Sequence, residues 1–497
     1  MAVVAAGVLA ARPLVLGDAD ESFVLYGARR VYEGQALYHD FFELLAPGAF
    51  YLFALVFAVG GQSLAAVRVA TGVVDVTSTV LVFVVARRLA APLEAAVVAL
   101  VFIAVGVPVW PYASAHWPVT AAGLGVAALL VSERAAALVP RRALAAGVLA
   151  GAACMMHQQR GAVLAVGTVA ALTVWALFAE PRDWRRWWRA VAAAIVGIVA
   201  VAGVVIGHAL TRASVREFWD ATVSQGLGGY RAWHGRQAVA WGGWGILSSG
   251  FLAYTWPWLL RALPWALAAE ALCLAWGRRA RHAVMWRMRL VTLVLAITAA
   301  AGIVYCPDYI HVTIVMPFLL LVAARLLHGV RSRAWWNRSS FLRPVPAVVL
   351  VAVLLAAAVK TVTNVQLAWK NAPLAFETRM GTLRGSRARL DMFAQIRAVV
   401  NPDGRDGVKL FAYPADAWLY LALPAEAATR FSLLLVGYNA PGAVAEVVSD
   451  LERGTPEFVF VLTTLVTPDD PIVRLIQTRY EPVGPIAPGG FLYRRRS

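Results

Sequence analysis

Long apolar stretches recur along the first 360 residues of this chain, and short polar or basic segments separate them. A helix needs roughly 20 apolar residues to cross a bilayer core about 30 Å thick. This pattern predicts a polytopic α-helical membrane protein with about eleven transmembrane helices. The predicted spans are 2–16, 64–86, 94–113, 119–138, 143–156, 161–179, 190–208, 260–276, 290–305, 312–328 and 345–360.

The apolar segment 47–61 is long enough to resemble a span, but we interpret it differently. Arg and Lys concentrate in the cytoplasmic loops of membrane proteins. A span at 47–61 would place Arg87, Arg88 and every later arginine cluster on the outside. We therefore expect a helix that lies in the outer membrane interface, with its aromatic residues at headgroup depth.

The same arginine rule predicts the orientation of the chain. If the first span runs outward, the arginine clusters fall on the cytoplasmic side, the N-terminus is cytoplasmic and the C-terminus is outside. No small-residue cleavage site follows the first span, so we interpret that span as retained rather than as a removable signal peptide. The clusters lie at 87–88, 141–142, 182–189, 278–289 and 331–343.

Composition excludes a soluble enzyme and a disordered chain. Hydrophobic residues make up 60% of the sequence and charged residues only 15%, whereas ordinary soluble proteins carry about 25% charged residues. The net charge of +17 is concentrated in the membrane part, with 30 basic and 15 acidic residues through Lys360 and 15 and 13 after it. We attribute this excess to membrane orientation and expect no nucleic-acid partner.

Helical and strand patterns alternate after Lys360, with Pro and Gly between them. We predict a transmembrane part at 1–360 whose first outer loop is 17–63, a linker at 361–377 and a small extracytoplasmic α/β domain at 378–497. The predicted elements of this domain are the helices Arg387–Val400, Ala415–Leu421, Gly442–Arg453 and Pro471–Tyr480 and the strands Val408–Tyr413 and Phe458–Leu462.

Acidic residues are concentrated in the first outer loop. Phe23, Tyr26 and Val31 recur at helical spacing there and predict an amphipathic helix. Asp20 and Glu21 fall at its N-terminus, where the helix dipole favours ionised carboxylates. A solvated loop with a helix-capping Asp is the alternative. The six acidic residues are Asp18, Asp20, Glu21, Glu33, Asp40 and Glu43.

Three runs, Gly17–Glu43, Pro47–Tyr51 and Gly60–Arg68, resemble the start of the GT-C glycosyltransferases. These membrane enzymes use polyprenyl-phosphate sugars and include protein O-mannosyltransferases and the lipid A aminoarabinose transferase. The resemblance lies in an acidic pair, an amphipathic helix, a turn with Gly and aromatic residues, a Pro-led interfacial helix and an Arg that opens the next span. It extends more loosely over the membrane part. It implies a GT-C-like fold and a catalytic first outer loop.

The resemblance also implies inverting transfer of a sugar to an extracytoplasmic lipid, glycan or protein acceptor. Such a reaction needs a base for the acceptor hydroxyl and cations for the leaving phosphate. Asp20 is the expected base, and Glu21, Asp18 and Asp40 are further catalytic candidates. Where the aminoarabinose branch has Glu-Lys-Pro, this chain reads Glu43-Leu-Leu-Ala-Pro47 and lacks the phosphate-contacting lysine.

Basic residues at outer helix ends are the candidates for binding the donor phosphate. His157 and Arg160 lie between two apolar segments, and Arg68 opens another. A charge in that position is costly unless it is paired or solvated, and planar guanidinium suits phosphate. A short polar turn between two helices is the alternative for His157 and Arg160.

A second polar cluster, Cys306–His311, makes Asp308 and His311 candidates for positioning substrate, together with Glu43. Residues three apart share a helical face, and we favour structural hydrogen bonding over metal binding for this pair. No cofactor is predicted, although the pair leaves a divalent metal open. Asp75 lies inside a span, where we favour hydrogen bonding between helices. The aromatic loop 209–245 fits either a substrate lid or an interfacial anchor.

The expected partners are a polyprenyl-phosphate sugar donor, the acceptor and a bacterial-type plasma (inner) membrane. A lipid or solute transporter or flippase is the rival function. Transporters commonly place ionisable groups at the bilayer midplane, in broken helices of paired repeats. In this chain the acidic residues gather in one outer loop and no repeat is visible, which favours the transferase.

Overall fold

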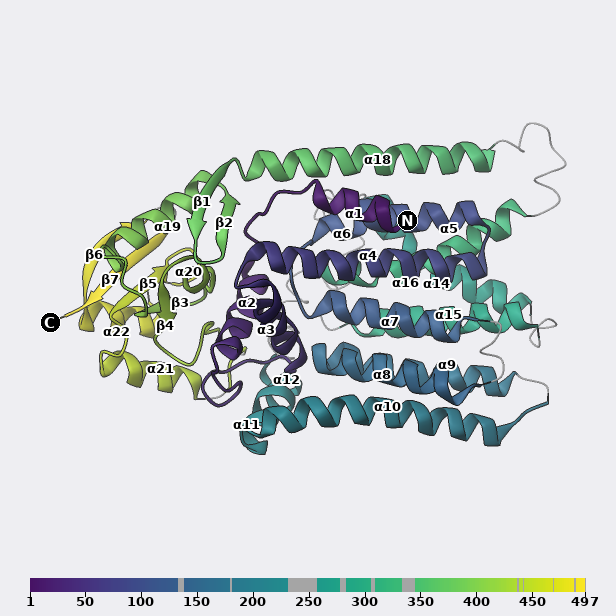
Figure 1. Ribbon diagram of the computed structural model, residues 1–497, viewed down its shortest axis with the longest axis horizontal. Coiled ribbons are helices and arrows are strands. Elements are labelled where there is room, and N and C mark those ends of the chain that lie inside the picture. The colour runs from purple at the N-terminus through teal and green to yellow at the C-terminus, as the bar shows by residue number, and fades with distance from the viewer. Residues whose placement is uncertain are drawn as a thin grey trace.

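The computed structural model consists of a long helical bundle with a small α/β domain at one end (Figure 1). The C-terminus lies in that domain, and the N-terminus lies within the bundle. The structure describes residues 1–132, 138–178, 181–230, 257–277, 283–304, 309–332, 345–435, 438–440, 442–467, 469–486 and 489–496.

The helices of the bundle run along its long axis (Figure 1). Among the described residues, seven helical segments are long and apolar enough to cross a membrane, which confirms a polytopic helical protein. The bundle contains α1 Ala2–Ala10, α4 Leu64–Leu89, α5 Pro92–Val101, η1 Phe102–Gly106, α6 Val107–Val109, α7 His116–Leu130, α8 Pro140–Met156, α9 Gln158–Leu177, α10 Trp184–Leu210, α14 Pro257–Trp276, α15 Val284–Ala301, α16 Tyr309–Arg331 and α18 Val345–Asn371.

The first expected span, 2–16, is wrong in its extent. Helix α1 has nine residues and ends at Ala10, so it covers only about 14 Å at 1.5 Å per residue. Beyond it, the backbone pairs with a strand of the α/β domain. Arg384 N donates to Leu14 O at 2.9 Å, and Leu16 N donates to Arg384 O at 3.2 Å. The start of the chain therefore joins the bundle to the domain.

Two shorter helices lie where the bundle meets the domain, across the direction of the spanning helices (Figure 1). They are α2, Ala19–Tyr32, and α3, Gly48–Gly60. The amphipathic helix and the separate helix at 47–61 are thus both present. The aromatic side chains of α3 differ from the expectation, because Phe50, Phe53 and Phe57 are buried inside the protein rather than placed at the surface.

The α/β domain is built on a five-stranded sheet with the order β4-β3-β5-β7-β6. Strand β3 is parallel to β4 and β5, and β7 is antiparallel to β5 and β6. Strand β5 is almost wholly buried, as is usual for a central strand covered on both faces. The elements are β1 Leu374–Thr378, β2 Gly381–Gly385, α19 Arg387–Val400, β3 Val408–Tyr413, α20 Trp418–Ala422, β4 Ala425–Ala427, α21 Ala443–Glu452, β5 Phe458–Leu462, α22 Pro471–Arg479, β6 Tyr480–Ile486 and β7 Gly490–Arg495.

Residues 361–377, interpreted from the sequence as a linker, are mostly regular structure. Helix α18 continues through Asn371, and β1 begins at Leu374. The chain therefore passes from the last helix of the bundle into the domain over two residues. Three short helical segments lie near the same end of the bundle: α11 Val215–Trp219, η3 Asp220–Ser224 and α12 Gln225–Leu227.

Candidate active site

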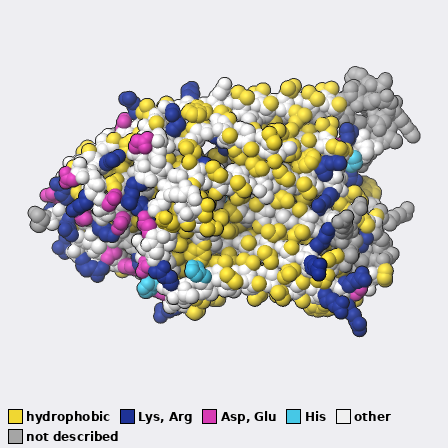
Figure 2. Space-filling model, viewed as in Figure 1, with side chains coloured by type: hydrophobic (Ala, Val, Ile, Leu, Met, Phe, Trp, Pro, Cys, Tyr) yellow, Lys and Arg dark blue, Asp and Glu magenta, His cyan; other side chains and the backbone are white. Residues whose placement is uncertain are grey.

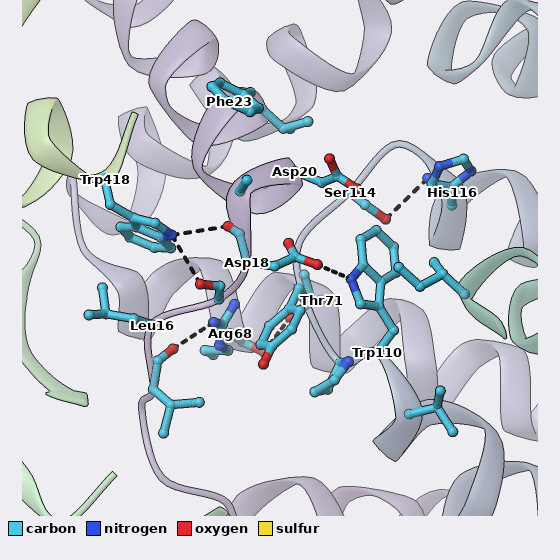
Figure 3. A pocket seen from close by; sticks show the side chains of 18 of the residues that line it. Leu16, Asp18, Asp20, Phe23, Arg68, Thr71, Trp110, Ser114, His116 and Trp418 are labelled. Atoms are coloured by element: carbon cyan, nitrogen blue, oxygen red, sulfur yellow. Dashed lines mark hydrogen bonds between the residues drawn. The ribbon is translucent and has the colours of Figure 1, made fainter. Parts of the chain in front are cut away.

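A cavity of about 1730 Å³ lies between the bundle and the α/β domain. Part of its wall is apolar and comes from α1, α4 and α18, including Ala6, Leu9, Val69, Val73 and Leu367. The rest is polar and comes from the start of α2, the residues before α7 and the α/β domain (Figure 3). The cavity therefore offers an apolar surface next to a group of charged side chains.

Asp18 caps helix α2 and is held by groups from both parts of the molecule. Its Oδ1 accepts from Glu21 N at 3.1 Å, and its Oδ2 accepts from Trp110 Nε1. Trp418 Nε1 donates to the backbone oxygens of Gly17 and Asp18 at 3.1 and 3.0 Å (Figure 3). Burial raises the pKa of Asp18 against the lowering effect of these hydrogen bonds. One carboxylate oxygen thus caps the helix, and the other binds the indole of Trp110.

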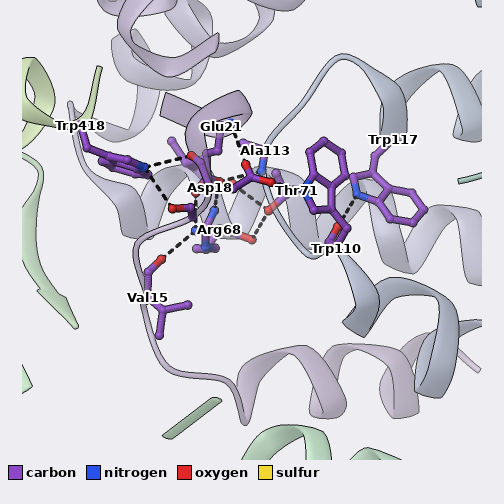
Figure 4. A network of polar contacts seen from close by, with 11 residues as sticks. Val15, Asp18, Glu21, Arg68, Thr71, Trp110, Ala113, Trp117 and Trp418 are labelled. Atoms are coloured by element: carbon purple, nitrogen blue, oxygen red, sulfur yellow. Dashed lines mark hydrogen bonds and ion pairs between the residues drawn. The ribbon is translucent and has the colours of Figure 1, made fainter. Parts of the chain in front are cut away.

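Glu21 is fully buried and its carboxylate is saturated by donors (Figure 4). Both terminal nitrogens of Arg68 bind it, with Nη2 2.8 Å from Oε2, and Ala113 N donates to Oε1 at 2.7 Å. Arg68 Nη2 also donates to Val15 O at 2.9 Å. Arg68 lines the cavity, but this network commits its guanidinium to joining α2 and α4.

Asp20 lies between these two acids, and its position differs from theirs. Its side chain is exposed and lines the cavity, on the side of Ser114 (Figure 3). Asp40 is not among the cavity-lining residues. Its Oδ2 accepts from Ala36 N at 2.6 Å and closes the turn that follows α2. The structure therefore places Asp18, Asp20 and Glu21 together and leaves Asp40 apart.

Glu43 lines the cavity although it is only 4% exposed. Burial raises its pKa to about 8, against the opposing charge of Arg30. This carboxyl group therefore holds its proton at neutral pH. A neutral carboxyl can donate a hydrogen bond to a ligand, which fits the expected positioning role of Glu43.

Three imidazole rings line one side of the cavity: His116, His157 and His311. The ring of His116 lies 4.7 Å from that of His157 and 5.1 Å from that of His311. Burial, with a smaller contribution from the nearby Arg160 charge, lowers the pKa of His157 to about 3. His157 is therefore neutral in this structure. His157 and His311 belong to two separate candidate groups in the sequence, and the structure places both of them next to His116.

Arg160 lies behind these rings and is not among the residues that line the cavity. Its Nη1 donates to His116 O at 3.1 Å, and its Nη2 donates to Thr120 Oγ1 at 3.1 Å. The contact of Arg160 with a donor phosphate that the sequence leads us to expect stays a prediction. The contacts of Arg160 hold the start of α7.

Solved structures match nearly the whole chain, whereas no family model and no curated protein matches it. ArnT from Cupriavidus metallidurans in the apo state has a TM-score of 0.57 at 14% identity, over 99% of this chain and 96% of that one. ArnT bound to undecaprenyl phosphate gives 0.54 at 14% identity, with the same coverage. AglB from Archaeoglobus fulgidus, with an inhibitory peptide and a dolichol-phosphate, gives 0.54 at 13%, over 100% and 74%. This chain has the GT-C fold.

Within this GT-C fold, the α/β domain contributes residues that the sequence did not single out. Arg389 Nη2 donates to Asp416 Oδ1 at 2.6 Å, and both residues line the cavity beside Trp418 and Tyr438. These residues lie about 400 positions from Asp18, so only a tertiary contact could reveal them. His116 is a further cavity residue of this kind, and its place at the start of the apolar helix α7 is a signal that the sequence does contain.

The remaining expectations concern residues 305–308 and 231–256, including Asp308 and most aromatic residues of the loop 209–245. These lie outside the described residues. Among the residues that the structure describes, no group of three or more His, Cys, Asp or Glu side chains is arranged to hold a metal ion.

Proposed function

We propose that this chain transfers a sugar from a polyprenyl-phosphate-linked donor to a hydroxyl group of an extracytoplasmic lipid, glycan or protein acceptor. One observation carries the proposal: the cavity joins an apolar wall made by α1, α4 and α18 to the acidic start of α2. A polyprenyl chain fits the apolar wall and a sugar fits the polar part. The GT-C fold supports the same reaction class.

The solved relatives support the type of donor. One ArnT structure contains undecaprenyl phosphate, and the AglB structure contains a dolichol-phosphate. Both molecules carry a phosphate on a long isoprenoid chain. By analogy, the donor of this chain is a sugar linked through phosphate to such a lipid.

The proposed chemistry is a displacement at the anomeric carbon of the sugar. The oxygen of the acceptor hydroxyl forms a bond to that carbon, and a carboxylate takes the hydroxyl proton. The bond between the carbon and the phosphate oxygen breaks, and its electron pair leaves on the polyprenyl phosphate. Because the attack comes from the face opposite to the leaving group, the configuration inverts.

Asp20 is the proposed general base. Asp18 uses its two oxygens to cap α2 and to bind Trp110, and Glu21 is neutralised by Arg68. Asp20, in contrast, is exposed on the cavity wall. Its place on the first turn of α2 favours the ionised form that a base requires.

Membranes that contain the full chain should be assayed with a panel of radiolabelled polyprenyl-phosphate sugars. General-base catalysis contributes about 10²–10⁴-fold in rate, so Asp20→Asn should lose that factor while the protein still inserts. Asp18→Asn should lose less activity, and part of that loss should be in stability. Asp40→Asn is the matched control and should retain transfer, because Asp40 does not line the cavity.

Normal transfer by Asp20→Asn together with inactivity of Asp18→Asn would move the base to Asp18. Wild-type membranes that transfer no sugar from the panel, but move a labelled lipid across the bilayer, would favour the transporter or flippase instead.

A further inference from the structure

Arg12 lies on the cavity wall between its apolar part and the acidic start of α2. It follows α1 by two residues and lines the cavity with Leu9 and Arg68. The end of α1 packs against α4 one turn beyond Arg68, because a Cβ added to Gly72 would lie 3.8 Å from Leu9 Cδ1. Arg12 is therefore placed where a lipid chain would end and its polar group would begin.

The guanidinium of Arg12 has an unused donor. Its Nη1 is buried and has no hydrogen-bond partner in the described part of the chain. Asp75, on α4, also lines the cavity and is 4% exposed, and its Oδ1 likewise has no hydrogen-bond partner among described residues. Arg12 and Asp75, both of which the structure describes, do not form an ion pair with each other. Unsatisfied charges at membrane depth are costly and mark functional sites.

Other arginines near the cavity are committed to the protein. Arg68 binds Glu21, and Arg389 binds Asp416. Arg384 donates to the backbone oxygens of Ala372 and Pro373 at 3.0 and 2.6 Å. The planar guanidinium of Arg12 is thus suited to accept a new anionic partner, and phosphate is the anion it recognises best.

We propose that Arg12 binds the phosphate of the polyprenyl-phosphate donor, and that Asp75 is its counter-charge when no donor is bound. The inference rests on the proposed function and adds its phosphate-binding residue. The isoprenoid chain lies along Leu9, Val73 and Leu367, and the phosphate at Arg12 directs the sugar toward Asp20. Charge balance follows, because the phosphate replaces the Asp75 carboxylate as the negative charge that balances Arg12.

The test measures binding of undecaprenyl phosphate to the purified full chain in detergent, with undecaprenol, inorganic phosphate and phosphatidylglycerol as comparison ligands. Arg12→Met should weaken undecaprenyl phosphate binding at least tenfold and leave undecaprenol binding unchanged. Arg12→Lys should lose less. Arg87→Met is the matched control, since Arg87 lies at the other end of α4 and does not line the cavity.

A second variant keeps the test valid if Arg12→Met folds poorly. The double variant Arg12→Met/Asp75→Asn removes both charges together and should fold, yet it should bind undecaprenyl phosphate as weakly as Arg12→Met. Asp75→Asn alone should bind at least as tightly as wild type, because the competing carboxylate is gone. A purely structural role for the two charges predicts the opposite, namely that the folded double variant binds normally.

Wild-type affinity in the folded double variant would overturn the role of Arg12. Equal competition by inorganic phosphate or phosphatidylglycerol would overturn the assignment to a polyprenyl phosphate. The proposed function can fail separately, because it fails if the wild type transfers no sugar. If the Arg12 variants keep both sugar transfer and donor affinity, only the role of Arg12 is wrong.

Discussion

At the scale of single residues, Glu43 links the cavity to the pH dependence of stability. The unfolded chain releases this proton near pH 4.5, and the folded chain keeps it up to about pH 8. Between these values the folded state binds more protons, so the free energy of unfolding falls as pH rises, and it levels off above pH 8. At about 1.36 kcal/mol per pKa unit, the total change is of the order of a few kcal/mol.

Glu43→Gln should remove this pH dependence, because Gln keeps the shape of a neutral carboxyl group. The difference in melting temperature between Glu43→Gln and wild type should therefore increase from pH 5 to pH 9 in the same detergent. Glu481→Gln is the control, since Glu481 is exposed in the α/β domain. Parallel melting curves for wild type and Glu43→Gln across this range would show that Glu43 is ionised in the folded protein.

Some site residues could be predicted from the sequence because their signal is local. Asp18, Asp20 and Glu21 stand before a helical pattern, and the structure places all three at the start of α2. The partners of each acidic residue could not be predicted in the same way, because they lie far away in the sequence. The donors that occupy Glu21 come from Arg68 and Ala113, and the indole that binds Asp18 comes from Trp110. Asp40 belongs to the same acidic loop, but a short turn takes it away from the cavity.

At the scale of elements, the Glu21–Arg68 pair fixes α2 against α4. Removing one partner of a buried ion pair costs about 3–5 kcal/mol, because the other charge is left unpaired. Arg68→Met should therefore lower the melting temperature strongly, and Glu21→Gln/Arg68→Met should recover part of the loss. A double-mutant cycle by thermal unfolding measures this coupling. If Arg68→Met instead weakened undecaprenyl phosphate binding at unchanged stability, the phosphate role expected from the sequence would be right.

Helices α8 and α10 approach each other through glycines, as is common between helices in membranes. A Cβ added to Gly147 would lie 2.0 Å from Ala194 O, and one added to Gly197 would lie 2.5 Å from Leu144 O. Both obstacles are backbone atoms, which cannot rotate away. Gly147→Ala should therefore cost about 1–3 kcal/mol by overpacking.

The melting temperature of Gly147→Ala in detergent checks this contact. Gly203→Ala on α10 is the matched control, because a Cβ there would meet nothing within 4 Å. An equal effect of the two substitutions would mean that the close contact between α8 and α10 does not limit stability.

Elements with a strong sequence period were predicted well, and edge strands were not. The helix Arg387–Val400 and the strands Val408–Tyr413 and Phe458–Leu462 have the predicted ends. Strand β4 has only three residues, and β6 contains Pro482, Gly484 and Pro485, which are unfavourable in strands. Such strands exist because a neighbouring strand pairs with them, β3 with β4 and β7 with β6. This pairing, rather than the strand propensity of their own residues, makes them strands.

At the scale of the whole molecule, the hydrophobic pattern was enough to predict a helical bundle followed by a small domain. It could not predict how the two parts join. Trp418 binds the backbone of Gly17 and Asp18, and Leu14–Leu16 pairs with Arg384. The N-terminal segment is thus held between bundle and domain. Because the cavity lies at this junction, its walls depend on contacts between the two ends of the chain.

The distribution of charge predicts which way the molecule faces. Lys and Arg gather at the end of the bundle farthest from the α/β domain, and hydrophobic side chains cover the region between (Figure 2). Basic residues at that end include Arg87 and Arg88 at the end of α4 and Arg331 at the end of α16. The positive-inside rule then predicts that this end is cytoplasmic and that the domain is extracytoplasmic.

Reporter fusions should therefore read inside after Arg88 and Arg289 and outside after Ala213 and Leu383. Helix α4 ends at Leu89, on the arginine-rich side, whereas α10 ends at Leu210, near the domain. An inside signal at Leu383 would reverse the whole molecule, since α18 leads directly into the domain.

In the predicted orientation the cavity opens on the outer side of the membrane. Its donor must then present its sugar on that side, so inverted vesicles supplied only from the cytoplasmic face should show no transfer unless the lipid is flipped.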